Sequence, residues 1–229
     1  FFLVYILTLD LEKAPTLRRP GRGRRRRDVA FLAGVLFLDL VHRLAARRLY
    51  LGSTGSFLVQ VGLVLLALLY WRRRRYPLAR MGVGRTHLWR ALAMGTLLGT
   101  LSVFAMTLSY PRGVPPVTLP TAAARAAGTL VSVGVLQSLY QYGFIQTTLQ
   151  SAVGPRAGMV ATAWLVGVLG LLPDLLLWSG VTTTLLIKTL LFTPVGTLLF
   201  GYLFYRTENL VAPAAARTLV DLLPQLVKF

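Results

Sequence analysis

The 229-residue chain contains no cysteine and little acidic charge, with 7 Asp and Glu residues against 25 Lys and Arg. Without cysteine there can be no disulfide, no thiolate nucleophile and no Cys-ligated metal. Charged residues make up only 14% of the chain and hydrophobic residues 55%, whereas about 25% of a soluble domain is charged. A fold of this composition cannot present a polar surface on all sides. The sequence therefore predicts an integral membrane protein.

Basic residues give the chain a formal net charge of +18, but their distribution does not indicate a nucleic-acid-binding protein. The arginines occur in short clusters between long apolar runs, which is typical of the loops of a multispan membrane protein. Nucleic acid is therefore not an expected partner.

The apolar runs predict an all-α fold, a polytopic transmembrane helix bundle with seven spans. The spans are expected at residues 29–41, 51–71, 88–110, 123–153, 158–172, 175–205 (or 181–205) and 209–223. The fragment Phe1–Leu9 is too short to cross a membrane alone, because a helix needs about 20 apolar residues. It either completes an eighth span or lies at the interface. Pro194 is expected to kink its span, and Gly95-x-x-x-Gly99 to allow close approach of a neighbouring helix.

Three parts are expected along the chain. Residues 1–28 form an apolar fragment with a basic Pro/Gly/Arg loop, residues 29–77 form two transmembrane helices, and residues 78–229 form a helical core. The positive-inside rule predicts that the basic loops face the cytoplasm, in a prokaryotic plasma membrane or an organellar membrane.

Two basic clusters are also expected to attract anionic lipid headgroups, although a role as topology signals alone would explain the same pattern. The lipid-facing residues of these clusters would be Arg24, Arg25, Arg26, Arg27, Arg72, Arg73, Arg74 and Arg75.

Polar residues inside the spans are candidates for function or for helix pairing. Arg217 and Asp221 are four residues apart, so they are expected to form a structural ion pair across one helical turn. Gln137 and Gln141 share a helix face in the same way and are expected to hydrogen-bond neighbouring helices. Asp39 and His42 belong to the first span. For both, extension of the polar end of the side chain toward the membrane surface, or pairing with a neighbouring residue, is favoured over a catalytic role.

No cofactor or metal site is predicted. The two histidines, His42 and His87, lie in the first third of the chain, and no helix carries two His or Glu residues at the spacing of metal ligands. The sequence leaves open whether lipid or pigment is bound.

Several later segments follow the order of motifs in a known family. They read Gln-Ser-Leu-Tyr-Gln-Tyr-Gly at 137–143 before Gly154-Pro155, Val-Gly-Val-Leu-Gly at 166–170, and Arg-Thr-Glu-Asn-Leu-Val-Ala-Pro at 206–213 before Arg217-x-x-x-Asp221. In this order the chain resembles the CPBP family, the CAAX-protease and bacteriocin-processing (Abi) intramembrane peptidases. The resemblance covers roughly residues 78–224 and implies that residues 78–229 form a CPBP-like core.

The resemblance also implies where chemistry would lie, and the chain departs from the family there. The family motifs read Glu-Glu-x-x-x-Arg, Phe-x-x-x-His and His-x-x-x-Asn. The matching positions hold Gln137, Ser138, Tyr142, Gly170, Arg217 and Asp221. An amide such as Gln137 does not accept a proton near neutral pH, and the permanently cationic Arg217 would repel a metal. The resemblance therefore implies a degenerate, inactive member with no catalytic residue.

These observations favour a non-catalytic structural or accessory subunit of a larger membrane complex, with other integral membrane subunits as partners. A photosynthetic or respiratory complex is a reasonable host. One alternative is an intramembrane CAAX-type peptidase that uses atypical residues such as Asp221 and Gln137. Another is a transporter of small molecules or lipids, which would use the glutamine stripe and the Arg217–Asp221 pair.

Overall fold

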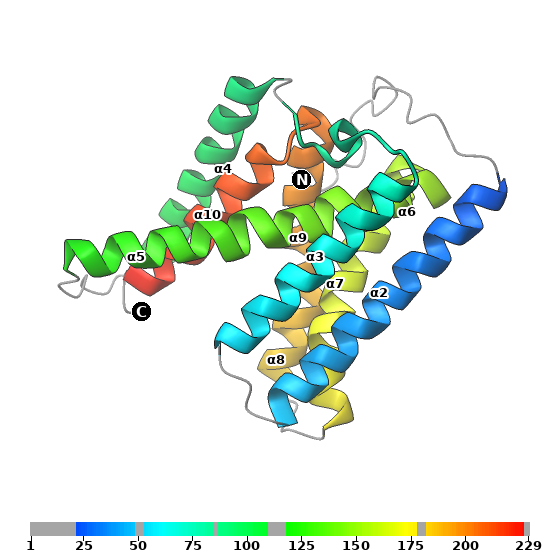
Figure 1. Ribbon diagram of the computed structural model, residues 1–229. Helices are drawn as coiled ribbons and strands as arrows, with labels where there is room; N and C mark the ends of the chain where they lie inside the picture. Colours follow the sequence, from blue (N-terminus) through cyan, green and yellow to red (C-terminus); the bar gives the residue numbers. More distant parts are fainter. Residues whose placement is uncertain (1–21, 49–52, 85–86, 110–117, 178–181, 227–229) are drawn as a thin grey trace.

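The computed structural model describes residues 22–48, 53–84, 87–109, 118–177 and 182–226, and all regular structure in these ranges is helical (Figure 1). The main helices are α2 (Arg22–Arg48), α3 (Ser53–Arg73), α4 (Leu88–Ser109), α5 (Leu119–Thr129), α6 (Thr147–Val153), α7 (Pro155–Leu176), α8 (Thr183–Ile187), α9 (Thr193–Thr207) and α10 (Val211–Leu226). The predicted all-α fold is confirmed. The fragment at residues 1–9 and the proline-rich loop at 111–117 lie outside the described residues.

Five of the described helices are long and apolar enough to cross a membrane. They cover Gly23–Arg48, Thr54–Arg73, Pro120–Val153, Pro155–Leu176 and Thr183–Thr207. The described apolar part of α4, Leu88–Phe104, is shorter, and α10 has 16 residues. These two shorter helices pack against each other beside the five long ones (Figure 1).

Helix α2 begins at Arg22, earlier than the expected start at Val29, so the first basic cluster lies on a helix and not in a loop. Arginine is a good helix former, which favours this extension. The buried carboxylate of Asp28 fixes the position of the first turns, because it accepts hydrogen bonds from the Tyr70 hydroxyl at 2.7 Å and the Tyr76 hydroxyl at 2.9 Å. Burial, which is the larger effect, and the hydrogen bond to Asp28 raise the pKa of Tyr76 above 10.0. The Tyr76 hydroxyl therefore stays protonated at neutral pH and continues to donate its hydrogen bond.

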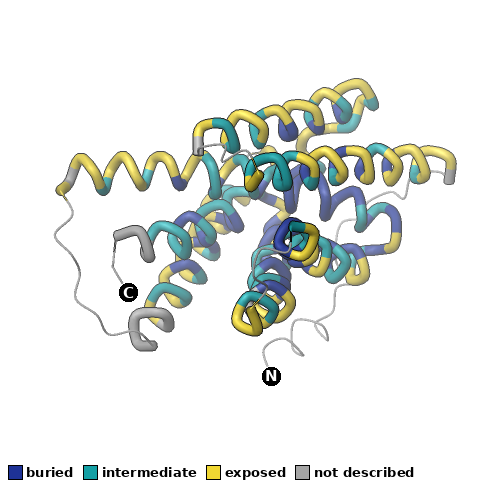
Figure 2. The backbone as a smooth tube through the Cα atoms, turned by 90° about the horizontal axis from the view of Figure 1, so that it is seen from below, coloured by how far each residue is buried: buried dark blue, intermediate teal, exposed yellow. Residues whose placement is uncertain are grey.

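The main core forms where α2 and α3 meet the long helix that spans residues 119–153. Figure 2 shows the buried residues concentrated in the middle of the molecule, with exposed residues on the outward helix faces. The buried apolar side chains of this core are Leu32, Val35, Leu63, Val64, Ala67, Trp71, Met81, Tyr140, Phe144 and Ile145.

The helix at 119–153 is continuous but contains two π-helical stretches, η3 (Leu130–Gln137) and η4 (Leu139–Gln146). Such wider turns occur frequently at functional sites. The predicted break at Gly154-Pro155 is confirmed: Gly154 has a φ of 99°, which allows α6 to turn sharply into α7.

The predicted end of the span at 158–172 is corrected. Helix α7 continues past Pro173 to Leu176, because a proline near the end of a helix disturbs only a few backbone hydrogen bonds. The next helix begins at Thr183, which is close to the later of the two predicted starts. A π-helical turn, η5 (Lys188–Phe192), lies just before α9, and the kink expected at Pro194 stays a prediction.

The Gly95-x-x-x-Gly99 pattern brings α4 against α10, as predicted. A Cβ atom on Gly95 would overlap the backbone of Ala212, and one on Gly99 would lie 2.9 Å from Cβ of Leu219. The two helices can therefore approach closely only because small residues line their contact.

Asn209 orders the start of α10. Its side-chain oxygen accepts a hydrogen bond from the Val211 amide at 2.9 Å.

We expect Gly95→Ala to destabilise the protein by about 1–3 kcal/mol, because the added methyl meets rigid backbone. The free energy of unfolding in mixed micelles measures this effect. Gly62→Ala is the matched control, since a Cβ on Gly62 has open space around it, and alanine in a helix is more favourable than glycine by about 1 kcal/mol. Equal stability changes in the two variants would contradict the proposed contact between α4 and α10.

Candidate functional site

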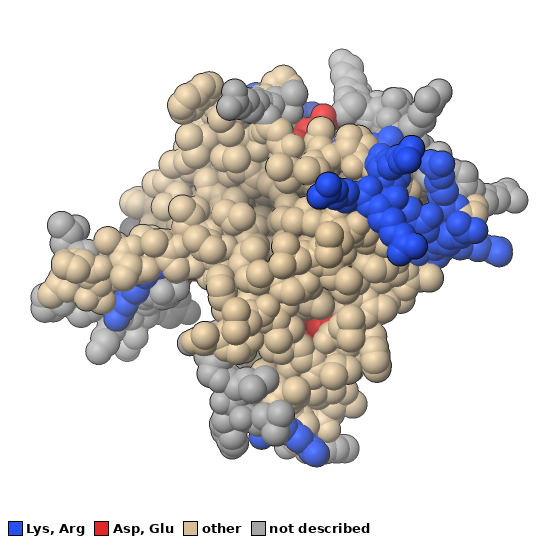
Figure 3. All heavy atoms as spheres, in the orientation of Figure 1, with Lys and Arg blue, Asp and Glu red and all other residues tan. Residues whose placement is uncertain are grey.

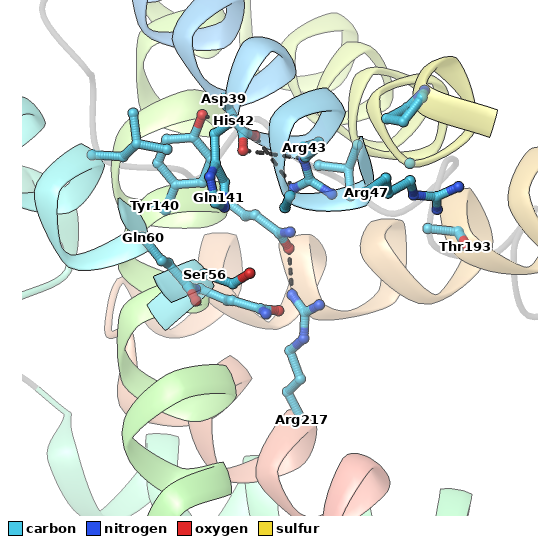
Figure 4. A pocket seen from close by; sticks show the side chains of 16 residues that line it. Asp39, His42, Arg43, Arg47, Ser56, Gln60, Tyr140, Gln141, Thr193 and Arg217 are labelled. Carbon is cyan, nitrogen blue, oxygen red and sulfur yellow. Dashed lines mark hydrogen bonds and ion pairs between the residues drawn. The ribbon is translucent and has the colours of Figure 1, made fainter. Parts of the chain in front are cut away.

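A cavity of about 440 Å³ lies between the helices, on the side of the core nearer the end of α2 (Figure 4). Helices α2, α3, α7, α9 and α10 and the two π-helical stretches all contribute to its wall. The lining residues are Asp39, His42, Arg43, Ala46, Arg47, Ser56, Gln60, Leu63, Gln137, Tyr140, Gln141, Val166, Gly170, Pro173, Thr193 and Arg217. Most of these side chains are polar, which is unusual for a space enclosed by apolar spans.

The carboxylate of Asp39 is buried at the wall formed by α2. Nε of Arg43 donates to one of its oxygens at 3.1 Å, and Nη2 donates to the other at 3.3 Å. The hydroxyl of Tyr140, on the long helix, also donates to this carboxylate at 3.4 Å. His42 lies one turn along the same face and is part of the cavity wall (Figure 4). The expectation that Asp39 pairs with a neighbour is therefore confirmed.

A second ion pair joins α2 to α7. The guanidinium of Arg47 contacts the carboxylate of Asp174, which is buried, while the arginine is 43% exposed. Since Asp174 directly follows the cavity-lining Pro173, this pair holds the two helices together at the cavity's edge.

Arg217 extends from α10 toward the opposite wall. It donates a hydrogen bond to the side-chain oxygen of Gln141, as Figure 4 shows. Its Nε also lies 3.6 Å from a carboxylate oxygen of Asp221, one turn further along α10. The predicted ion pair on α10 is confirmed, and Gln141 of the glutamine stripe accepts the predicted hydrogen bond with a neighbouring helix.

The positions at which the chain departs from the family motifs come together only in part. Gln137, Gly170 and Arg217 line the cavity. Ser138 and Tyr142 are fully buried beside it and do not form its wall. Asp221 faces Arg217 and is 43% exposed. Three of the six residues therefore share one cavity.

Sequence reasoning missed the contribution of α2 and α3 to this cavity. Asp39 and His42 were assigned to pairing or snorkelling, and Gln60 was not considered. The available signal was the presence of ionisable side chains within an apolar span, which marks candidate functional positions. The described residues contain no cluster of three His, Cys, Asp or Glu side chains able to hold a metal.

Residues 119–223 match a family model described as type II CAAX prenyl endopeptidase Rce1-like. This part of the chain is an Rce1-like domain. The resemblance to the CAAX-protease family is thereby confirmed, and the chain is an integral membrane protein carrying a domain of that family. The Rce1-like domain supplies Gln137, Gly170 and Arg217 to the cavity, whereas α2 and α3 precede it. Comparisons with curated proteins and with solved structures found no significant match.

We expect Arg217→Leu to lower the free energy of unfolding. Removing one partner of a fully buried ion pair costs about 3–5 kcal/mol. The side chain of Asp221 is 43% exposed, so water can partly solvate the carboxylate that is left behind. We therefore expect a smaller loss of about 2 kcal/mol. The double variant Arg217→Leu/Asp221→Leu should lose less, because no charge is left behind. Chemical unfolding in mixed micelles measures both variants. The same loss in the single and the double variant would mean that the two charges do not interact.

Proposed function

We propose that this chain is a non-catalytic member of the CAAX protease family and serves as an accessory subunit of a larger membrane complex. The observation that carries the proposal is the lining of the cavity. Where the family motifs have Glu and His, the cavity presents the amide of Gln137, the bare backbone of Gly170 and the guanidinium of Arg217.

The chemistry of these groups supports binding or structural support over hydrolysis. Peptide hydrolysis by a carboxylate base needs a side chain that accepts a proton from water, and an amide does not do so near neutral pH. Arg217 is held by Gln141 and Asp221, so its charge is already compensated. The carboxylate that remains in the cavity, on Asp39, accepts hydrogen bonds from Arg43 and Tyr140.

The surface of α5 supports the second part of the proposal. This end of the long helix projects beyond the bundle, and most of its described residues are exposed (Figures 1 and 2). Its sequence is rich in alanine, and a Cβ on Gly128 would have open space around it. Small residues let a second helix approach closely within a membrane.

A groove beside α5 gives such a helix a place to bind. It has a volume of about 500 Å³ and is lined by Thr54, Phe57, Arg125, Gly128, Thr129, Val131, Ser132 and Val133. A transmembrane helix of another subunit is the proposed occupant, with photosynthetic and respiratory complexes as the first hosts to examine.

The proposed absence of peptidase activity is tested with the protein reconstituted into nanodiscs and a prenylated Cys-a-a-X peptide as substrate. We expect no more cleavage than protein-free discs give, because the family's glutamate position holds the amide of Gln137 and the carboxylate of Asp39 is already paired with Arg43. Mass spectrometry of the peptide measures the outcome. Cleavage that disappears in an Asp39→Asn variant would overturn the proposal.

That same result would support a second candidate, a peptidase with atypical residues. The observation that favours it is the presence of Asp39 and His42 in the cavity wall, a carboxylate and an imidazole on one helix face. In such an enzyme α2, and not the Rce1-like domain, would supply the base. Retained cleavage in Arg48→Gln, an exposed site on the same helix, would serve as the control.

The accessory role is tested by extraction from native membranes in mild detergent, followed by native electrophoresis and mass spectrometry. We expect comigration at fixed stoichiometry with a complex much larger than this chain. The variant Ala123→Leu/Ala127→Leu, which enlarges exposed side chains of α5, should release the chain from the complex. Ala30→Leu, at an exposed position of α2, should not. Migration of the parent chain alone would refute the accessory role.

A further inference from the structure

The two basic clusters, far apart in the sequence, meet at one end of the molecule. Arg24–Arg27 lie on the first turns of α2, and Arg72–Arg75 lie at the end of α3, which packs beside it. Figure 3 shows their side chains as one continuous basic surface. We call these eight residues, together with the nearby Arg80, the basic patch.

A fixed framework holds the basic patch together. Asp28 binds the hydroxyls of Tyr70 and Tyr76, which joins the start of α2 to the end of α3. Nε of Arg74 donates to the Tyr70 hydroxyl at 3.2 Å, and its guanidinium lies 5.3 Å from the centre of that ring. The guanidinium of Arg80 lies 5.7 Å from the centre of the Tyr76 ring. The patch is therefore built on buried contacts and is not a loose loop.

The charge of the basic patch is largely uncompensated among the described residues. Its nine arginines surround one carboxylate, Asp28, which already accepts the two tyrosine hydrogen bonds. Nε of Arg25 is buried and has no hydrogen-bond partner in the described part of the chain. Like charges gathered in this way repel one another, so an external anion would stabilise the arrangement.

The position of the basic patch indicates where that anion comes from. It lies where two apolar spans end, which is the level of lipid headgroups in a membrane. Along α2 the nearest residues of the patch and the cavity, Arg27 and Asp39, are about 18 Å apart, at 1.5 Å per residue. The patch is therefore distinct from the candidate site in the cavity.

We propose that the basic patch binds the phosphate groups of anionic phospholipids on the cytoplasmic side of the membrane. Guanidinium groups match phosphate geometry and bind it through paired hydrogen bonds. Clusters of basic residues next to a span attract anionic lipid surfaces. This binding is independent of whether the cavity is catalytic.

The test compares lipid binding to the detergent-purified chain by native mass spectrometry, with phosphatidylglycerol and phosphatidylcholine as probes. We expect preferential retention of phosphatidylglycerol. Each basic residue near an anionic surface contributes about fivefold in affinity, so Arg26→Gln/Arg73→Gln should weaken retention by roughly 25-fold. Arg48→Gln/Arg90→Gln removes the same charge at exposed positions outside the patch and should leave retention nearly unchanged.

Two further measurements separate the sources of phosphate. Arg26→Lys/Arg73→Lys keeps the charge and should retain most of the binding, which also shows that changes at these positions permit folding. Inorganic phosphate and a short single-stranded DNA, each added at the phosphate concentration of the lipid, should not displace it. Displacement by either competitor, equal retention of both lipids, or equal weakening in the control variant would overturn the proposal.

Discussion

Water is absent from the interior of a membrane, so a charged side chain within a span must find its partner inside the protein. This constraint organises the cavity end of the molecule. Three carboxylates there are each matched by an arginine. The pairs are Asp39 with Arg43, Asp174 with Arg47, and Asp221 with Arg217. Two pairs lie within single helices, while the third joins α2 to α7. Together with the hydrogen bond from Arg217 to Gln141, they determine which polar groups face the cavity.

Close packing of backbones is the second requirement, because lipid provides little hydrophobic force to drive helices together. Gly95 and Gly99 allow α4 to meet α10, and Gly158 allows α7 to pack against the backbone of the preceding helix at Gln150. These contacts tolerate no side chain at the glycine. They hold α4 against α10 and α6 against α7, and both α7 and α10 contribute residues to the cavity wall.

The Rce1-like domain and the helices that precede it both contribute residues to the cavity wall. The domain contributes the amides of Gln137 and Gln141 and the paired arginine Arg217, whereas α2 contributes four ionisable groups, Asp39, His42, Arg43 and Arg47. The π-helical turns of η3 and η4 lie in the stretch that carries Gln137 and Gln141. Such turns alter which side chains share a face, so they contribute directly to the composition of the cavity wall.

The sequence by itself determined the features that depend on local spacing. Hydropathy predicted the apolar helices, four-residue spacing predicted the pair of Arg217 and Asp221, and Gly154-Pro155 predicted the sharp turn before α7. Each of these follows from helix geometry within a few residues. The motifs of residues 137–213 also indicated the family of the C-terminal part.

Tertiary structure alone decided the rest. The position of the first turns of α2 depends on contacts of Asp28 with tyrosines 42 and 48 residues away. Similarly, the contact that places Asp39 beside Tyr140 spans 101 residues. The spacing of apolar and polar residues along the sequence does not predict such contacts, because they arise from the packing of whole helices and not from the pitch of any one helix.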